Sequence, residues 1–225
     1  MTGGLFQLNQ ELLFQWGARA AVLLVCLPVH EFAHAYAANK LGDETSEKQG
    51  RLTLNPFVHL DIAGSVLLLF AGFGWAKPVP VNPNAFQNPR RDMALVAFAG
   101  PLANIIMAII LMSSLRILIH SVAAGTISPM FANLFQILNF MIFINLALAV
   151  FNLFPVPPLD GSKFFGALLP EKYYFGMMRY ERFAFIALII LLFTGRLSDI
   201  IINLTSRLFV LVNHLTRPID MIFGG

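Results

Sequence analysis

The sequence predicts an all-α polytopic membrane protein with about four to five transmembrane helices, a re-entrant segment and short β-strand or loop elements. Hydrophobic residues make up 57% of the 225-residue chain, and charged residues only 12%. A soluble domain of this length carries roughly a quarter charged residues. This chain has too few charged residues to cover the surface of a soluble protein. The mean hydropathy of +0.72 likewise indicates that lipid surrounds much of it.

Five segments make up the first half of the chain. A long helix is predicted from about Gln10 to Asn39, and a polar loop follows over 40–60. Within that loop, residues 50–56 alternate in polarity like a short strand that ends in a turn. Residues 62–76 are apolar but fewer than the roughly 20 that a spanning helix needs. The prolines of 77–83 favour an extended segment.

The second half contains two further long apolar helices, predicted over about 93–119 and 131–153. The prolines within 154–161 break the third helix at its end. A shorter apolar stretch covers about 183–193. The last segment, 198–215, mixes apolar and charged side chains, so it could span the bilayer, pack against other helices or lie at the interface.

Basic residues define the predicted orientation. They fall in the two regions that follow the first and third long helices, at Lys40, Lys48, Arg51, Lys77, Arg90, Arg91, Lys163, Lys172, Arg179 and Arg182. The connection 120–130 has none. The positive-inside rule places the two basic regions in the cytoplasm and 120–130 outside. It also predicts that 62–76 dips into the bilayer and returns, and that the N-terminus is external.

The net charge of +3 does not indicate a nucleic-acid partner, because the basic residues form no stripe. The single cysteine, Cys26, cannot form an internal disulfide and is interpreted as a buried apolar residue. No basic residue precedes Arg19, so a cleavable signal peptide is not predicted. We expect residues 1–225 to form a single membrane-embedded domain of a multi-pass protein in a prokaryotic plasma membrane.

The strongest motif is His30-Glu31-Phe-Ala-His34. On a helix, positions i and i+4 share one face, so His30 and His34 can bind one metal ion, and Glu31 can reach a water on that metal. With this composition the motif is expected by chance on the order of 0.003 times. A group of ionisable residues in an apolar helix is otherwise costly, so we predict one zinc ion per chain.

A third protein ligand must come from another helix. Asp160 follows the third long helix within the proline-broken segment, and irregular backbone at membrane depth is tolerated where it lines a cavity. An ordinary loop aspartate that caps the next helix is an equally good reading of Asp160 alone.

The two motifs together resemble the site-2 protease family of intramembrane zinc metalloproteases, in its minimal prokaryotic type without a PDZ or CBS domain. The similarity covers residues 20–165 and includes Asn152-x-x-Pro-x-x-Pro-Leu-Asp160-Gly161, Gly74-Trp-Ala-Lys-Pro-Val-Pro-Val-Asn-Pro83 and Ala99-Gly-Pro-Leu-Ala-Asn104. The resemblance implies that His30, His34 and Asp160 bind zinc and that Glu31 is the general base. It also implies that Asn152 helps to polarise the substrate carbonyl.

Other polar residues have simpler interpretations. Asp61 suits the N-cap of the 62–76 segment, and His59 beside it could also support the site. Asn104 is interpreted as a packing or hydrogen-bonding residue rather than a catalytic one. His120 and His214 are expected to be solvated near the membrane interfaces.

The predicted function is cleavage of peptide bonds in or near the transmembrane segments of other membrane proteins, with the site toward the cytoplasm. The extended segments near 50–55 and 78–82 could supply an edge that pairs with an unwound substrate. Two alternatives stay open. A metal-ion transporter would spread its ligands along a path, and an inactive binding protein of the same fold would lack one of the site residues.

Overall fold

A computed structural model describes residues 15–71, 74–122, 129–170 and 181–223. Its described elements are all helices, and none of them forms a β-ladder. The longer helices are α2 (Leu27–Lys40), α4 (Ile62–Ala71), α5 (Pro89–Val122), α6 (Pro129–Asn152), α9 (Glu181–Phe193) and α10 (Arg196–Thr216). The shorter elements are η1 (Val22–Cys26), α3 (Thr45–Lys48), η2 (Pro56–Val58), η3 (Pro83–Ala85), α7 (Asp160–Gly166) and α11 (Pro218–Phe223).

Three helices in the described residues are long and apolar enough to cross a membrane, and a bent pair would make a fourth. The three are Gln15–Lys40, Pro89–His120 and Asn133–Asn152. They match the three long helices predicted from the sequence. Their outward side chains are apolar, since Ile106 and Ile110 on α5 are about half exposed. An exposed apolar stripe of this kind requires lipid around it, so the all-α, multi-pass prediction is confirmed.

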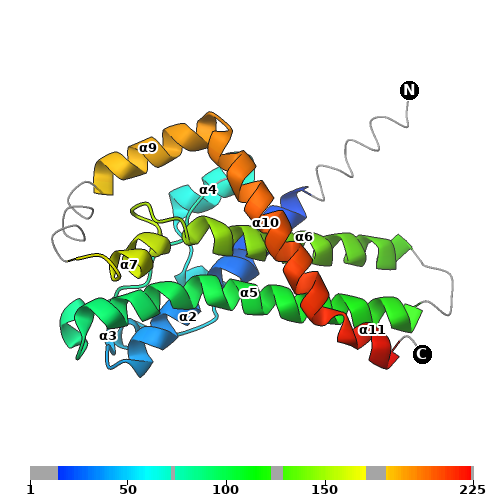
Figure 1. Ribbon diagram of the computed structural model, residues 1–225, viewed down its shortest axis with the longest axis horizontal. Coiled ribbons are helices and arrows are strands. Elements are labelled where there is room, and N and C mark those ends of the chain that lie inside the picture. The colour runs from blue at the N-terminus through cyan, green and yellow to red at the C-terminus, as the bar shows by residue number, and fades with distance from the viewer. Residues whose placement is uncertain (1–14, 72–73, 123–128, 171–180, 224–225) are drawn as a thin grey trace.

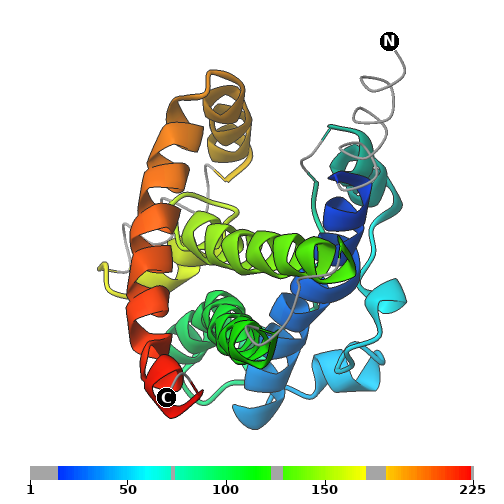
Figure 2. The same cartoon turned by 90° about the vertical axis from the view of Figure 1, so that its right-hand side faces the viewer.

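The antiparallel pair α5 and α6 lies at the centre of the molecule (Figure 1). Seen along this pair, α2 flanks one side and α10 the other (Figure 2). Buried apolar side chains hold α5, α6 and α10 together: Ala108, Met112, Leu115, Ile142, Leu146 and Val212. The α5–α6 pair is thus the scaffold against which α2 presents its polar residues.

The first helix changes its hydrogen-bond pattern just before the histidine motif. Over η1 the chain is a π-helix, and the N–H of Leu27 reaches back five residues to the carbonyl of Val22. Pro28, which has no N–H to continue an α-helical ladder, follows directly. Single π-turns within α-helices occur often at functional sites. Here the π-turn ends at Cys26, four residues before His30.

Helix α4 occupies the segment predicted to be too short to span. Asp61 caps it, because Oδ1 of Asp61 accepts a hydrogen bond from the N–H of Gly64 over 2.8 Å. An antiparallel bridge between Leu60 and Ala76 brings the two ends of the segment together. The N-cap prediction is confirmed, and the short length and closed ends agree with a re-entrant segment.

The strand predicted at 50–55 does not form. The backbone bends at Leu52 and Thr53 instead of continuing as an extended strand. Arg51 is buried and donates hydrogen bonds to the carbonyls of Val58, Lys77 and Pro78. A guanidinium with five N–H donors can satisfy several carbonyls at once. The side chain of Arg51, rather than a strand, therefore connects this loop to residues 58 and 77–78.

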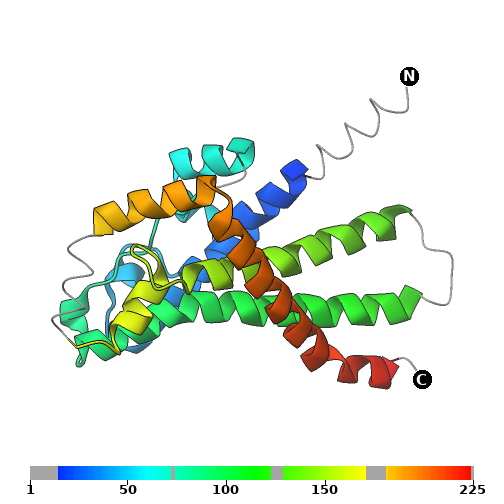
Figure 3. The same ribbon diagram turned by 45° about the horizontal axis from the view of Figure 1, so that its top comes forward.

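Helices α9 and α10 meet at an angle of 81° (Figure 3). Gly195 sits at the corner with φ of +76°, a left-handed conformation that glycine adopts without strain. At the far end of α10, Arg116 of α5 binds Asp220 of α11 and the side chain of Thr216. The 198–215 segment, predicted with three possible roles, is a helix that packs across α5 and α6, and as part of the bent pair it is also a candidate span.

Candidate metal centre

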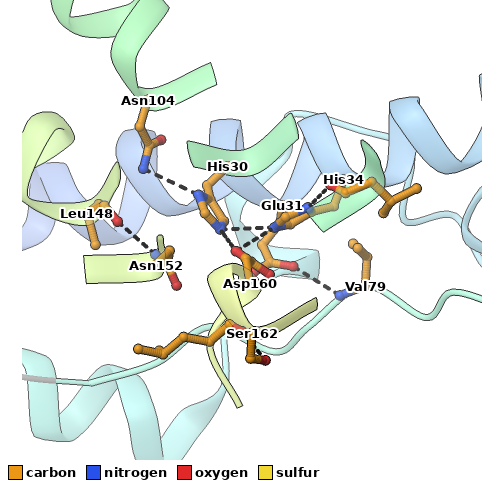
Figure 4. A network of polar contacts seen from close by, with 11 residues as sticks. His30, Glu31, His34, Val79, Asn104, Leu148, Asn152, Asp160 and Ser162 are labelled. Carbon is orange, nitrogen blue, oxygen red and sulfur yellow. Dashed lines mark hydrogen bonds and ion pairs between the residues drawn. The ribbon is translucent and has the colours of Figure 1, made fainter. Parts of the chain in front are cut away.

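Helix α2 presents His30 and His34 on one face, as their i, i+4 spacing predicts. Both side chains are buried, at 4% and 7% exposure. Their Nε2 atoms lie 3.0 Å apart, and the two rings meet edge to face. Both Nε2 atoms point at one carboxylate (Figure 4).

That carboxylate belongs to Asp160, the first residue of α7. Its Oδ2 lies 3.1 Å from Nε2 of His30 and 3.2 Å from Nε2 of His34. The prolines after α6 stop that helix, so the chain can turn and begin α7 beside α2. Gly161 is needed at this turn, because a Cβ there would overlap the backbone of Leu153 and Phe154.

The three side chains form a group that fits a zinc ion. Their ligand atoms make a nearly equilateral triangle with edges of 3.0 to 3.2 Å. Neighbouring ligands of a tetrahedral zinc with bonds near 2.0–2.1 Å are about 3.3 Å apart. Two imidazoles and one carboxylate are also a usual donor set for a zinc site with one open position. In the described part of the chain, this is the one group of three or more such ligands.

Glu31 lies beside the triangle without joining it (Figure 4). Its Oε2 accepts a hydrogen bond of 3.0 Å from the backbone N–H of Val79, in the extended segment that leads to η3. Glu31 is 9% exposed. One carboxylate oxygen is thus fixed by the backbone, while the group as a whole stays next to the two histidines.

One face of α5 packs against the two histidines. The carbonyl of Val96 accepts from Nδ1 of His34 over 2.7 Å, and the amide of Asn104 lies 3.3 Å from Nδ1 of His30. Gly100 lies between them. A Cβ at position 100 would stand 2.6 Å from Cε1 of His30 and closer still to Nε2 of His34. The sequence predicts a packing or hydrogen-bonding role for Asn104 but does not identify His30 as its partner.

A cavity of about 1060 Å³ adjoins the triangle. Its walls come from α2, α5, α6, α7 and α9 and from the 74–81 segment. Asn152, the last residue of α6, is on this wall, and its Nδ2 donates to the carbonyl of Leu148 over 3.0 Å. Asn152 has no hydrogen bond to the three ligands among the contacts of the described residues. The structure therefore places it within reach of a molecule in the cavity.

The remaining histidines lie apart from the triangle. His59 is fully buried, and its Nε2 lies 2.8 Å from the carbonyl of Thr53 in the neighbouring loop. His120 does not stand free in solvent as expected, because its Nε2 contacts Oδ1 of Asp220 at 3.0 Å. His214 is exposed on α10, in agreement with the solvated role predicted for it.

Comparison with known proteins gives one family match. The model of the family described as peptidase family M50 matches residues 18–195. That range contains His30, Glu31, His34, Asn152 and Asp160. It covers most of the chain and ends at the corner between α9 and α10.

Three relatives illustrate the range of similarity. A protein of Bacillus subtilis named "Putative zinc metalloprotease YwhC" is 44% identical over 172 residues, which are 76% of this chain and 78% of that protein. "Putative zinc metalloprotease Rip2" of Mycobacterium tuberculosis is 30% identical over 199 residues, 85% of this chain and 73% of that protein. "Zinc metalloprotease MJ0392" of Methanocaldococcus jannaschii is 28% identical over 203 residues, 87% of this chain and 48% of that protein. No solved structure matches the chain.

Proposed function

Since this chain belongs to peptidase family M50 and is a zinc metalloprotease, we propose that it cuts other membrane proteins in or next to their transmembrane segments. The observation that carries this proposal is the buried triangle of His30, His34 and Asp160 with Glu31 at its edge. Its ligands meet at one point, as hydrolysis requires, whereas a metal transporter would need them along a path. We further propose that residues 1–225 act as one membrane-embedded metalloprotease domain.

In this proposal His30, His34 and Asp160 hold the zinc ion. When bound, zinc acidifies water and polarises the substrate carbonyl. Glu31 accepts a proton from the attacking water and passes it to the leaving amine. Oε2 of Glu31 is already held by Val79, which leaves Oε1 for this transfer. Buried groups of this kind need no reorganisation at the moment of reaction.

Asn152 is proposed to bind the carbonyl oxygen of the scissile bond. An asparagine amide carries two N–H donors, and one of these is used by the carbonyl of Leu148. The second can be donated into the cavity that Asn152 lines. A hydrogen bond of this type stabilises the negative charge that develops on the carbonyl oxygen.

The extended segment 77–82 is proposed to align the substrate. The carbonyls of Pro78 and Pro80 face away from the site, where Arg51 and Ser46 donate to them. The N–H of Val79 faces the site but is used by Glu31, so the carbonyl of Val79 and the backbone groups of Val81 are the ones proposed to be open to a substrate. Pro78 and Pro80 do not weaken this edge, because they face away from the site and their missing N–H groups are not needed for pairing there. An unwound substrate could pair with the valine edge.

Cleavage is proposed to take place near the cytoplasmic face of the plasma membrane. Lys40 and Lys163 follow His34 and Asp160 closely in the sequence, and basic residues favour the cytoplasmic side. His34 lies about 9 Å of helix from Lys40 at 1.5 Å per residue. Water reaches such a depth at less cost than the centre of the bilayer.

Reconstitution tests this function directly. The zinc-loaded protein and the Glu31→Gln variant would be placed in liposomes with a model transmembrane substrate, and the products mapped by mass spectrometry. We expect wild type alone to cut, near the cytoplasmic end of the substrate's span. Equal cleavage by both proteins would exclude the proposed base, and a cut at the opposite end would reverse the orientation. Proteomics of membrane fractions with the same two proteins would then identify native substrates.

A further inference from the structure

Three residues on one face of α5 contact the two histidines of α2. Val96, Gly100 and Asn104 are spaced by four, so they follow one another along a single helix face. Val96 offers its carbonyl to His34, Gly100 leaves room for both rings, and Asn104 lies against His30. Val96 and Asn104 therefore lie at the Nδ1 atoms, the ring nitrogens that point away from Asp160, and Figure 4 shows the contact between Asn104 and His30.

Zinc binding imposes one protonation pattern on both rings. A neutral imidazole carries one proton, on either Nδ1 or Nε2. The Nε2 atoms of His30 and His34 face Asp160 and each other, so Nε2 must be the unprotonated ligand atom in each. The proton then lies on Nδ1, which becomes a donor and needs an acceptor. For His34 that acceptor is the carbonyl of Val96.

The corresponding partner of His30 is Asn104. This side chain is fully buried, and its Nδ2 lies 3.3 Å from Nδ1 of His30. Its Oδ1 is buried without a hydrogen-bond partner among the described residues. An amide N–H facing a protonated Nδ1 would bring two donors together, whereas a half-turn of the amide group would bring Oδ1 there instead.

We propose that Asn104 is a positioning residue for the zinc site: its Oδ1 accepts the Nδ1 proton of His30 and so keeps Nε2 open for the metal. The inference rests on the proposed function of the same site and adds a residue to it. Asn104 acts through His30 and touches neither the metal nor the substrate. Partners of this kind orient a ligand ring and raise its basicity, and their loss typically costs about 10- to 100-fold in metal affinity.

A second buried asparagine supplies a matched control. Asn145 on α6 is also fully buried, and its Oδ1 also has no partner within the described structure. Its Nδ2 donates to Cys26 Sγ and to the carbonyl of Met141, away from the three ligands. A role in helix packing alone would make the two asparagines equivalent with respect to zinc.

The test is zinc affinity, measured in purified full-length protein by competition with a chromophoric chelator. Asn104→Leu keeps the size of the side chain but removes the acceptor, so zinc should bind about 10- to 100-fold more weakly. Asn104→Asp restores an acceptor and should recover most of the affinity. Asn145→Leu should bind zinc like wild type. If Asn104→Leu does not give monodisperse protein, Asn104→Ala replaces it in the comparison with Asn104→Asp.

The outcomes separate the two proposals. Wild-type affinity in the acceptor-free variant would overturn the role of Asn104, and so would an Asn104→Asp variant as weak as the acceptor-free one. Both results leave the proposed function intact, provided that wild type binds zinc through His30, His34 and Asp160. A wild-type protein that binds no zinc would instead overturn the proposed function itself.

Discussion

The backbone N–H of Val79 donates a hydrogen bond of 3.0 Å to Oε2 of Glu31. This contact joins the helix that carries the metal ligands to the extended segment proposed to align the substrate. A single hydrogen bond therefore connects the proposed base to the segment proposed to bind substrate. Changes in either element should therefore affect the other.

Substituting the metal ligands and the base should have different effects on zinc. We expect about one zinc ion per wild-type chain. The zinc content should fall strongly in His30→Ala, His34→Ala and Asp160→Asn, because each substitution changes one of the three ligands. Glu31→Gln should keep the zinc and lose activity by about 10²- to 10⁴-fold. Metal analysis by mass spectrometry together with a cleavage assay checks this. Full zinc content in His34→Ala would refute the assignment.

Gly100→Ala should weaken zinc binding although alanine is the better helix former. The added Cβ would lie 2.6 Å from Cε1 of His30, so one histidine must move out of the ligand triangle. Gly17→Ala is the control, because a Cβ at Gly17 meets no atom within 4 Å. We expect zinc affinity to fall at least about 10-fold for Gly100→Ala, as for other losses around a metal site. Chelator competition on both variants measures it, and equal affinities would contradict the prediction.

Arg51→Lys should lower stability and activity while leaving the zinc in place. A lysine ammonium cannot reproduce the planar fork with which Arg51 binds the carbonyls of Val58 and Pro78. Each buried carbonyl left without a partner costs about 1–3 kcal/mol. Thermal unfolding, zinc content and cleavage rate would be compared with Arg207→Lys, an exposed arginine whose side chain contacts Asn203. An unchanged melting temperature in Arg51→Lys would argue against the structural role.

Cysteine labelling should find positions 48 and 88 on the same, cytoplasmic face and position 125 on the other. Lys48 and Asn88 are exposed, and the segment 62–71 between them forms a helix of only 10 residues. Position 125 lies outside the described residues and is chosen from the sequence alone. The native Cys26 is fully buried and should not react with a membrane-impermeant maleimide. Labelling of positions 48 and 88 from opposite faces would mean that the segment between them crosses the bilayer.

The sequence was sufficient to predict the long helices and to identify the candidate metal ligands. Apolar length alone predicts a membrane-spanning helix, and the spacing of His30 and His34 places them on one face without knowledge of the fold. Asp160 was identified with the help of the family resemblance, since a lone loop aspartate could equally be a helix cap. Its contact with both histidines could not be predicted locally, because it depends on the fold that places α7 next to α2.

Relations between distant segments could not be predicted from the local pattern. Polarity alternation at 50–55 suggested a strand, but the backbone bends there and the buried side chain of Arg51 binds the carbonyls of Lys77 and Pro78. Asn104 was interpreted as a packing or hydrogen-bonding residue without a named partner, because the sequence does not say which side of α5 faces α2. The same holds for Gly100, whose missing Cβ matters only once two histidines lie against it.

The separation of the ligands along the chain has a consequence for biosynthesis. His30 and Asp160 are 130 residues apart, and all of α5 and α6 must be synthesised between them. At about 5–20 residues per second, roughly 6 to 26 seconds pass between the two ligands leaving the ribosome. During that interval the nascent chain has two histidines and no carboxylate to complete the proposed site. With the proposed ligands, the zinc site can therefore form only after α5 and α6 have been synthesised.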